Sequence, residues 1–256
     1  MGVDTFEIQG VTVSSYYLQT KAQDEYRELE RQFITDAITG FSNRYGSFPR
    51  NRMAIVEGTN GGMEYSGLAT IDGIPFLNQK NEDYNKTFRN TVHEIGHSWF
   101  YDCMGNVEYR EGWIDEGLVS FASSDDILTL DCRSYEMLRK YSDNNPDAKE
   151  YTAARNSVMK MNEKIIKDYD HYYVNEPRDV HDSEGEVGTK EYVYAPLFLR
   201  QAREIMGDEE FLACLKDVYN TYTWKTADTK GIIEIFRMHD SSDKLSELIR
   251  FYFTGV

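Results

Sequence analysis

The chain has 256 residues, of which 40% are hydrophobic and 14% aromatic, enough to bury the core of one large domain or of two closely packed lobes. Its formal net charge of −16 argues against nucleic acids and anionic membrane surfaces as partners, because both attract clustered Lys and Arg. No apolar run approaches the ~20 residues that a membrane span needs, and the three widely spaced cysteines imply neither a disulfide framework nor a thiolate metal site. We therefore expect a domain that is soluble as given.

The first part of the chain predicts strands combined with a long helix. Residues 6–18 (FEIQGVTVSSYYL) are rich in β-branched and aromatic side chains and predict one or two strands. Residues 22–46 carry apolar side chains at helical spacing and end in glycine, which predicts an amphipathic helix. Residues 53–58 and 67–73 predict two more strands, on either side of a glycine-containing segment, 59–66, that can turn sharply.

From Thr87 onward the pattern is nearly all helical, with a break near residue 130. The predicted fold class is α+β: a lobe with a mixed sheet and helices over residues 1–130, then an all-helical lobe over 131–256. The two lobes are expected to form one domain with a cleft between them. The acidic, glycine-containing segment 174–194 predicts a loop that borders this cleft.

Residues 93–97 (HEIGH) indicate a metal site on the predicted helix 87–105. Positions i and i+4 of a helix lie on one face about 5–6 Å apart, so His93 and His97 can present two imidazoles to one metal ion. Glu94 lies beside them, where a carboxylate can act on a metal-bound water without being a ligand. The pattern predicts one Zn²⁺ per chain and requires a third ligand.

Two carboxylates follow at the start of the next predicted helix, Asp115 and Glu116. Both residue types are also favoured at a helix N-terminus for capping and for their interaction with the helix dipole. The residues alone therefore leave either one as the third ligand.

Residues 93–121 (HEIGHSWFYDCMGNVEYREGWIDEGLVSF) resemble the zinc region of the gluzincin aminopeptidases of the aminopeptidase N family. The resemblance rests on HSWFY, on the GN pair and on W-I-D-E-G, and it extends over nearly the whole chain. It implies a thermolysin-like zinc-metallopeptidase lobe in which His93, His97 and Glu116 bind zinc and Glu94 is the general base. It also implies that Glu111 accepts a hydrogen bond from a zinc-bound imidazole; a solvated surface glutamate is the alternative.

Residues 59–67 (TNGGMEYSG) resemble the family's G-x-M-E-N exopeptidase motif. The resemblance implies that Gly61, Gly62 and Met63 run along the bound peptide and that Glu64 pairs with its free α-amino group. Such pairing favours amino-terminal substrates, because an internal peptide bond offers no cation to the carboxylate. Tyr65 stands where the family usually has Asn.

Residues 192–211 (YVYAPLFLRQAREIMGDEEF) resemble the family segment that carries a tyrosine whose hydroxyl stabilises the oxyanion of the tetrahedral intermediate. The alignment implies that Tyr192 is this residue. Tyr194 and Ala195 replace the Lys-Gly pair of the family, and Tyr194 is the alternative.

The function implied is that of a zinc aminopeptidase, which releases amino-terminal residues from peptides by a metal-activated water. Two alternatives stay open: an endopeptidase of the same superfamily, in which Glu64 is incidental, and a catalytically silent zinc- or peptide-binding module. Family members usually carry a large amino-terminal β-domain for which this chain has no room, so we expect either a catalytic fragment of a longer protein, such as an exported one, or a minimal relative. The sequence predicts neither an oligomeric state nor a compartment.

Overall fold

The protein is described by a computed structural model. The described residues are 1–17, 19, 23–58, 61–72, 84–141, 145–168, 173–178 and 184–256. The chain forms two compact units, unit 1 (Met1–Ser98 and Asp126–Ala153) and unit 2 (Trp99–Asp125 and Ala154–Val256). Each unit combines two separate stretches of the chain, whereas the predicted lobes 1–130 and 131–256 are each continuous. The division into those two lobes stays a prediction.

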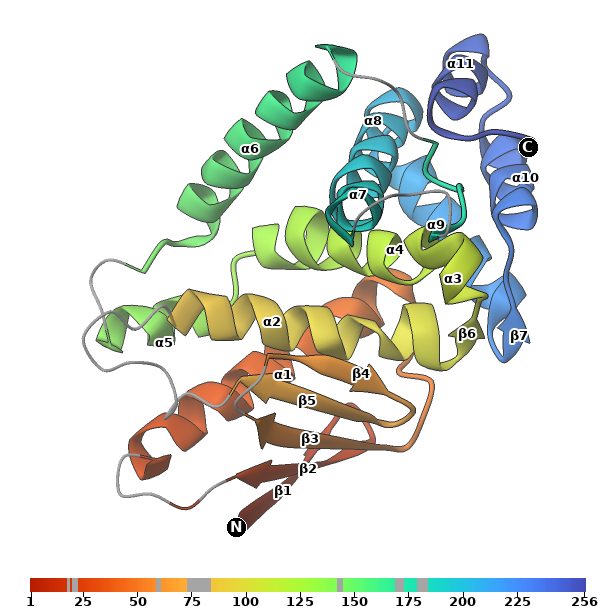
Figure 1. The fold of residues 1–256 in the computed structure, drawn as a ribbon. Coiled ribbons are helices and arrows are strands. Elements are labelled where there is room, and N and C mark those ends of the chain that lie inside the picture. Colours follow the sequence, from red (N-terminus) through yellow and green to blue (C-terminus); the bar gives the residue numbers. More distant parts are fainter. Residues whose placement is uncertain are drawn as a thin grey trace. The chain divides into compact units, whose positions relative to one another are not determined.

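Unit 1 contains a five-stranded mixed sheet (Figure 1). Its strands lie in the order β1-β2-β3-β5-β4. β1 pairs with β2, and β4 with β5, in antiparallel fashion, while the β2–β3 and β3–β5 pairs are parallel. Among the described residues, β4 therefore ends the sheet. The bounds are β1 (Gly2–Ile8), β2 (Val11–Tyr17), β3 (Arg52–Gly58), β4 (Met63–Tyr65) and β5 (Leu68–Asp72).

Residues 6–18, predicted to form one or two strands, belong to the hairpin of β1 and β2. The backbone angles of two residues explain its turn. Gln9 and Gly10 both adopt positive φ, 48° and 84°, the backbone that a tight two-residue hairpin turn requires. In β2, Val11, Val13 and Ser15 are buried in alternation, as expected of a strand with one covered face. The prediction of one or two strands over residues 6–18 is confirmed, whereas the turn and the alternation were not predicted.

Helices pack against one face of this sheet. Helix α1 (Gln23–Tyr45) confirms the helix predicted over 22–46, and helix α2 (Tyr84–Gly96) runs beside β5 (Figure 1). Phe33 of α1 stacks on Phe88 of α2 with ring centroids 4.8 Å apart, and Tyr135 meets Phe88 edge-on at 5.4 Å. Tyr135 belongs to α5 (Arg133–Tyr141), which η5 (Ile127–Thr129) precedes. This aromatic core holds α2, the helix with the HEIGH sequence, in unit 1.

Unit 2 is mostly helical. Phe198 lies at its centre, with Phe236, Tyr252 and Phe253 at centroid distances of 5.5, 5.8 and 4.8 Å. A short parallel pair joins β6 to β7. The elements are η2 (Ser98–Asp102), β6 (Met104–Gly105), α3 (Glu108–Glu111), η3 (Gly112–Ile114), α4 (Glu116–Phe121), η4 (Ala122–Asp126), α6 (Ala148–Asp168), α7 (Glu184–Thr189), η7 (Lys190–Tyr194), α8 (Ala195–Met206), α9 (Asp208–Tyr222), β7 (Lys225–Thr226), α10 (Thr229–His239) and α11 (Asp243–Tyr252). Three of these elements include residues of unit 1: the first residue of η2, the last residue of η4 and the first part of α6.

The mixed sheet combined with helices confirms the predicted α+β fold class. Two details differ from the prediction. The α-helix expected over 87–105 ends at Gly96. It is followed by a π-helical turn, Ser98–Asp102, in which Phe100 departs from helical angles with φ −115° and ψ 40°. The loop prediction for 174–194 is wrong over 184–194, which forms α7 and η7; residues 179–183 lie outside the described residues.

Within the described part of the chain, no helix combines the length and the apolar character that crossing a bilayer requires.

Candidate metal centre and active site

Two histidine rings meet at the C-terminal end of α2, where His93 lies in the helix and His97 directly follows its last residue. The Nε2 atoms of His93 and His97 lie 3.2 Å apart, and the two rings are nearly perpendicular, with an interplanar angle of 83°. Two imidazoles bound to one tetrahedral zinc at 2.0–2.1 Å bring their nitrogens to about 3.3 Å from one another. The pair therefore has the separation of two ligands of a single zinc ion, because the end of α2 and the turn at His97 place the rings about one helical turn apart.

Glu94 lies next to this pair, and a glycine makes room for its carboxylate. The side chain is buried, and its Oε1 accepts a hydrogen bond from Asn90 Nδ2 at 3.2 Å. A Cβ atom at Gly62 would overlap Glu94 Oε1, so no other residue fits there without moving the carboxylate. The segment that carries Gly62 thus lies directly against the predicted general base.

Glu64 joins this group from the edge strand β4. Met63 and Tyr65 are exposed, at 46% and 52%, while Glu64 between them is only half-exposed, as the alternation of a strand requires. One carboxylate oxygen each of Glu64 and Glu94 and one ring nitrogen of His97 all lie within 4.8 Å of one another. Unit 1 therefore brings the predicted base, one predicted zinc ligand and the predicted amino-terminus anchor into one cluster.

Gly61, before this strand, has a backbone that favours glycine. Its φ is +87°, a conformation that side chains disfavour, and its N–H donates to Asp72 Oδ1 at 2.8 Å. Asp72 ends β5, so the hydrogen bond ties the start of the glycine segment to the neighbouring strand. This arrangement agrees with the sharp turn predicted for residues 59–66, of which 59 and 60 lie outside the described residues.

Asp115 and Glu116 lie in unit 2, at the start of α4. Asp115 is buried and precedes the helix, yet within the described part of the chain its side chain accepts no capping hydrogen bond from the helix backbone. Glu116 is half-exposed and is the first residue of α4. The predicted ligand set is thus divided between the units of the chain, with two histidines in unit 1 and the carboxylate in unit 2.

Glu111 has a defined partner in unit 2. Its Oε1 accepts the backbone N–H of Thr229 at 2.7 Å, at the first residue of α10. Trp113 Nε1 donates to the hydroxyl of the same threonine at 2.8 Å. Glu111 is therefore held by the start of a helix rather than only by solvent, and its role toward a zinc-bound imidazole stays a prediction.

The two candidate tyrosines differ in exposure. Tyr192 is 43% exposed, whereas Tyr194 is 4% exposed and burial raises the pKa of its hydroxyl. Both lie on η7, a π-helical turn, which rotates successive side chains differently from an α-helix. Of the two, only Tyr192 offers its ring to solvent.

Two buried charged residues, Lys190 and Glu191, directly precede Tyr192 and were not predicted from the sequence. Lys190 Nζ donates to Glu176 O at 2.6 Å, and burial lowers the pKa of this lysine. Glu191 accepts two hydrogen bonds from Arg178, both of 3.0 Å; burial raises the pKa of Glu191, and Arg178 opposes this. No periodic signal could have paired these residues, because they come together only when 184–194 folds as a helix.

Gly112 and Gly117 permit this packing in unit 2. A Cβ atom at Gly112 would overlap the Glu191 carboxylate, and one at Gly117 would lie 2.5 Å from Ala195 Cβ. Gly112 and Gly117 therefore allow η3 and α4 to approach η7 and α8.

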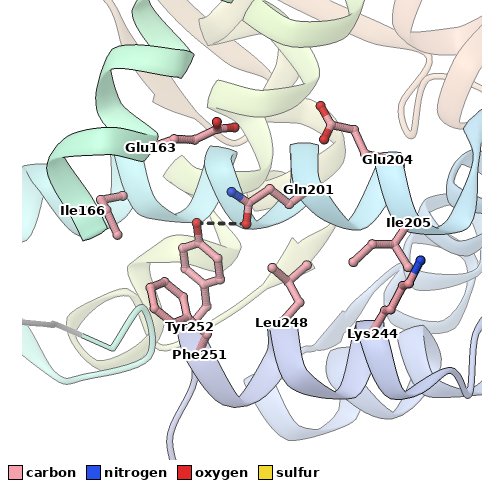
Figure 2. A pocket seen from close by; sticks show the side chains of 9 residues that line it. All are labelled: Glu163, Ile166, Gln201, Glu204, Ile205, Lys244, Leu248, Phe251 and Tyr252. Carbon is pink, nitrogen blue, oxygen red and sulfur yellow. Dashed lines mark hydrogen bonds between the residues drawn. The ribbon is translucent and has the colours of Figure 1, made fainter. Parts of the chain in front are cut away.

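A separate cavity of about 570 Å³ opens in unit 2 between α6, α8 and α11 (Figure 2). Apolar side chains from α6, α8 and α11 line it together with the carboxylates of Glu163 and Glu204, and Tyr252 donates to Gln201 Oε1 at 3.3 Å (Figure 2). None of its lining residues belongs to the predicted site.

The mixed sheet, the covering helices and the paired histidines agree with the metallopeptidase lobe that the sequence predicts. The family model described as the peptidase family M1 domain matches residues 29–252. The chain belongs to peptidase family M1. No curated protein matched the sequence.

Solved structures show the same fold at low sequence identity. The M1 zinc metallopeptidase from Deinococcus radiodurans has a TM-score of 0.65 at 15% identity, covering 98% of this chain and 52% of that one. A mutant of it gives 0.66 at 14% identity, covering 100% and 52%. The mutant bound to a Tyr-Ser-Ala substrate gives 0.62 at 14% identity, with the same coverage. The chain spans about half the length of these relatives.

Proposed function

We propose that the protein is a zinc-dependent aminopeptidase, which hydrolyses the peptide bond after a free amino-terminal residue. The observation that carries this proposal is the cluster of Glu64, Glu94 and His97, whose donor atoms lie within 4.8 Å of one another. A peptide substrate is consistent with the solved relative that binds Tyr-Ser-Ala.

His93, His97 and Glu116 are the ligand set that we propose. Two imidazoles and one carboxylate form a donor set used by catalytic zinc sites, and the 3.2 Å separation of the histidine nitrogens fits it. When bound, zinc supplies Lewis acidity, which lowers the pKa of water and polarises a carbonyl. Glu64 and Glu94 are close enough to His97 to be ligands themselves, but the H-E-x-x-H pattern keeps its glutamate outside the ligand set.

Glu94 is the general base in this proposal. It takes a proton from the attacking water and later passes it to the leaving amine. Its burial suits this work, because a water-poor site strengthens the interaction of the carboxylate with the reacting groups. The Asn90 hydrogen bond and the backbone at Gly62 restrict where the carboxylate can lie.

Glu64 gives the proposed amino-terminal specificity. Its carboxylate would bind the α-ammonium group of the substrate, while the edge of β4 offers main-chain groups to the peptide beyond it. An internal peptide bond would leave this carboxylate without a cation and pay the cost of desolvating it. The proximity of Glu64 to Glu94 puts the anchor beside the base, as removal of a single residue requires.

Tyr192 is the residue that we propose to stabilise the oxyanion of the tetrahedral intermediate. An exposed phenol can donate a hydrogen bond to an oxyanion, and stabilisation of charge that develops in the transition state raises kcat. The exposure of Tyr192 and the burial of Tyr194 support this choice.

A pair of substrates tests the proposal: an aminoacyl-p-nitroanilide with a free amino group and its N-acetylated form. We expect cleavage of the free form only, and loss of that preference in Glu64→Ala. Equal cleavage of both forms, with internal cuts in a peptide pool, would indicate an endopeptidase. One zinc per chain without turnover of any peptide would indicate a silent binding module.

A further inference from the structure

A relay of hydrogen bonds in unit 1 joins the glycine segment to the proposed general base. Gly61 N donates to Asp72 Oδ1 at 2.8 Å, and Asp72 N donates to Asn90 Oδ1 at 3.4 Å. Asn90 Nδ2 then donates to Glu94 Oε1 at 3.2 Å. The relay starts beside the edge strand β4 and ends on the carboxylate of Glu94.

We propose that Asn90 is a positioning residue that couples the peptide-binding edge of the sheet to Glu94. The inference rests on the proposed function, since it needs Glu94 to be the base. Asn90 itself is not placed on the substrate; it acts through the carboxylate that it holds.

The chemistry of the amide suits this position. One partner of Asn90 is a backbone N–H, which needs an acceptor, and the other is a carboxylate, which needs a donor. Only a side chain with both functions satisfies both, and the two partners determine which way the amide faces. Asn90 and Glu94 are also i and i+4 on α2, so the hydrogen bond closes without strain between neighbouring turns.

Gly62 restricts the position of the Glu94 carboxylate in addition to Asn90. Glu94 Oε1 lies so close to Gly62 that any side chain there would overlap it. Asn90 therefore keeps Oε1 on the side of the glycine segment, and a rotation of Glu94 away from that segment costs the Asn90 hydrogen bond. A shift of residues 61–65 on peptide binding can reach Glu94 by two routes, through the Gly62 contact and through the relay from Gly61.

The test compares zinc-loaded wild type with Asn90→Leu, Asn90→Asp and Asn90→Gln on the substrate that the wild type cleaves best. Asn90→Leu removes both hydrogen bonds, and Asn90→Asp replaces the donor by a second carboxylate. We expect kcat to fall about 10- to 100-fold in both, because a misplaced catalytic group costs this much, while KM changes little and zinc content stays at one per chain. Asn90→Gln keeps the amide and should recover part of kcat.

Asn85 provides the matched control. It lies on the same helix, is buried, and donates from Nδ2 to Asn145 Oδ1 at 3.3 Å. Asn85→Leu should lower the melting temperature at least as much as Asn90→Leu and leave kcat unchanged. Equal kcat losses in the two variants, or no rescue by Asn90→Gln, would mean that Asn90 has only a structural role.

Glu94→Gln separates failure of this inference from failure of the proposed function. If Glu94→Gln abolishes turnover and Asn90→Leu does not reduce kcat, the inference is wrong and the function stands. If Glu94→Gln keeps full activity, or the wild type cleaves nothing in a peptide pool, both are overturned.

Discussion

The Nε2 atom of His93, in the last turn of α2, lies 3.2 Å from that of His97, which directly follows the helix. This separation is set locally, by residues four positions apart, and it matches two ligands of one tetrahedral zinc ion. A third protein ligand then leaves one position open for water or substrate, as catalytic zinc sites do.

Substitution of the two candidate carboxylates decides which one is that ligand. Glu116→Gln should lower zinc affinity by more than the roughly 10- to 100-fold that loss of an outer partner costs. Asp115→Asn should keep one zinc per chain. Metal analysis after dialysis against a graded chelator measures both, and zinc loss in Asp115→Asn alone would reverse the assignment.

Glu94→Gln should keep zinc and lower kcat about 10²- to 10⁴-fold, the range that general acid–base catalysis contributes. The amide retains the shape of the side chain, so the Gly62 contact is preserved. Metal content and steady-state kinetics on the same preparation give the result. Loss of zinc in this variant would instead place Glu94 among the ligands.

Tyr192→Phe should lower kcat about 10²- to 10³-fold, the usual loss on removing one oxyanion donor. Tyr194→Phe is the control, because it removes a hydroxyl group of the same kind from a buried tyrosine two residues further along the chain. Initial rates at saturating substrate compare the two. A larger kcat loss in Tyr194→Phe would exchange the roles.

Asp126 is the buried partner of an ion pair with Arg44 in unit 1. It accepts hydrogen bonds from Arg44 Nε at 2.8 Å and from the Tyr45 hydroxyl at 2.7 Å, and its side chain has no exposure to solvent. Arg44→Met should destabilise the protein by about 3–5 kcal/mol, because it leaves a buried carboxylate without its cation.

Arg139→Met is the matched control for Arg44→Met in urea denaturation. Arg139 pairs with Asp147 at 2.7 Å, but both side chains are substantially exposed, at 51% and 35%. Its loss should cost no more than about 1 kcal/mol. Similar costs in the two variants would show that the burial of Asp126 does not set the effect.

His239 in unit 2 makes stability depend on pH. Burial alone would lower the pKa of His239, but its hydrogen bonds to Glu210 and Asp217, of 2.6 and 2.9 Å, outweigh this and raise the pKa. Because the folded pKa lies above the unfolded value of about 6.5, the stabilisation is complete below pH 6.5 and is lost as pH rises through the folded pKa.

Thermal unfolding of wild type and His239→Gln from pH 5.5 to 8.5 measures this dependence. The difference in melting temperature between the two should be largest at the acid end and shrink as pH rises. A difference that grows with pH would contradict the raised pKa.

Features that depend on neighbours along the chain were predicted well. Helix α1 and strands β2, β3 and β5 follow the periodicity of their apolar residues, because a face that must be buried repeats with the period of the element. The H-E-x-x-H arrangement was predictable for the same reason, since i and i+4 are neighbours on any α-helix. Even the Asn90–Glu94 hydrogen bond has this spacing, although the pattern does not assign it a role.

The segment 184–194 shows where such reasoning fails. Its glycines and charged residues are typical of a loop. In the fold, Lys190 and Glu191 are buried with partners, the carbonyl of Glu176 and the guanidinium of Arg178, so their burial is compensated and the segment folds as helical turns. Partners of this kind are visible only after the chain has folded.

By itself, the sequence determined the α+β fold class, the close spacing of His93 and His97 and the membership of a peptidase family, because these depend on local spacing and on long matched motifs. Only the tertiary structure decided that Gly62 lies against Glu94, that Asn90 links it to Asp72, and that Tyr192 is exposed while Tyr194 is buried. These are contacts between elements, and close packing of side chains rather than the period of any one segment determines which atoms meet.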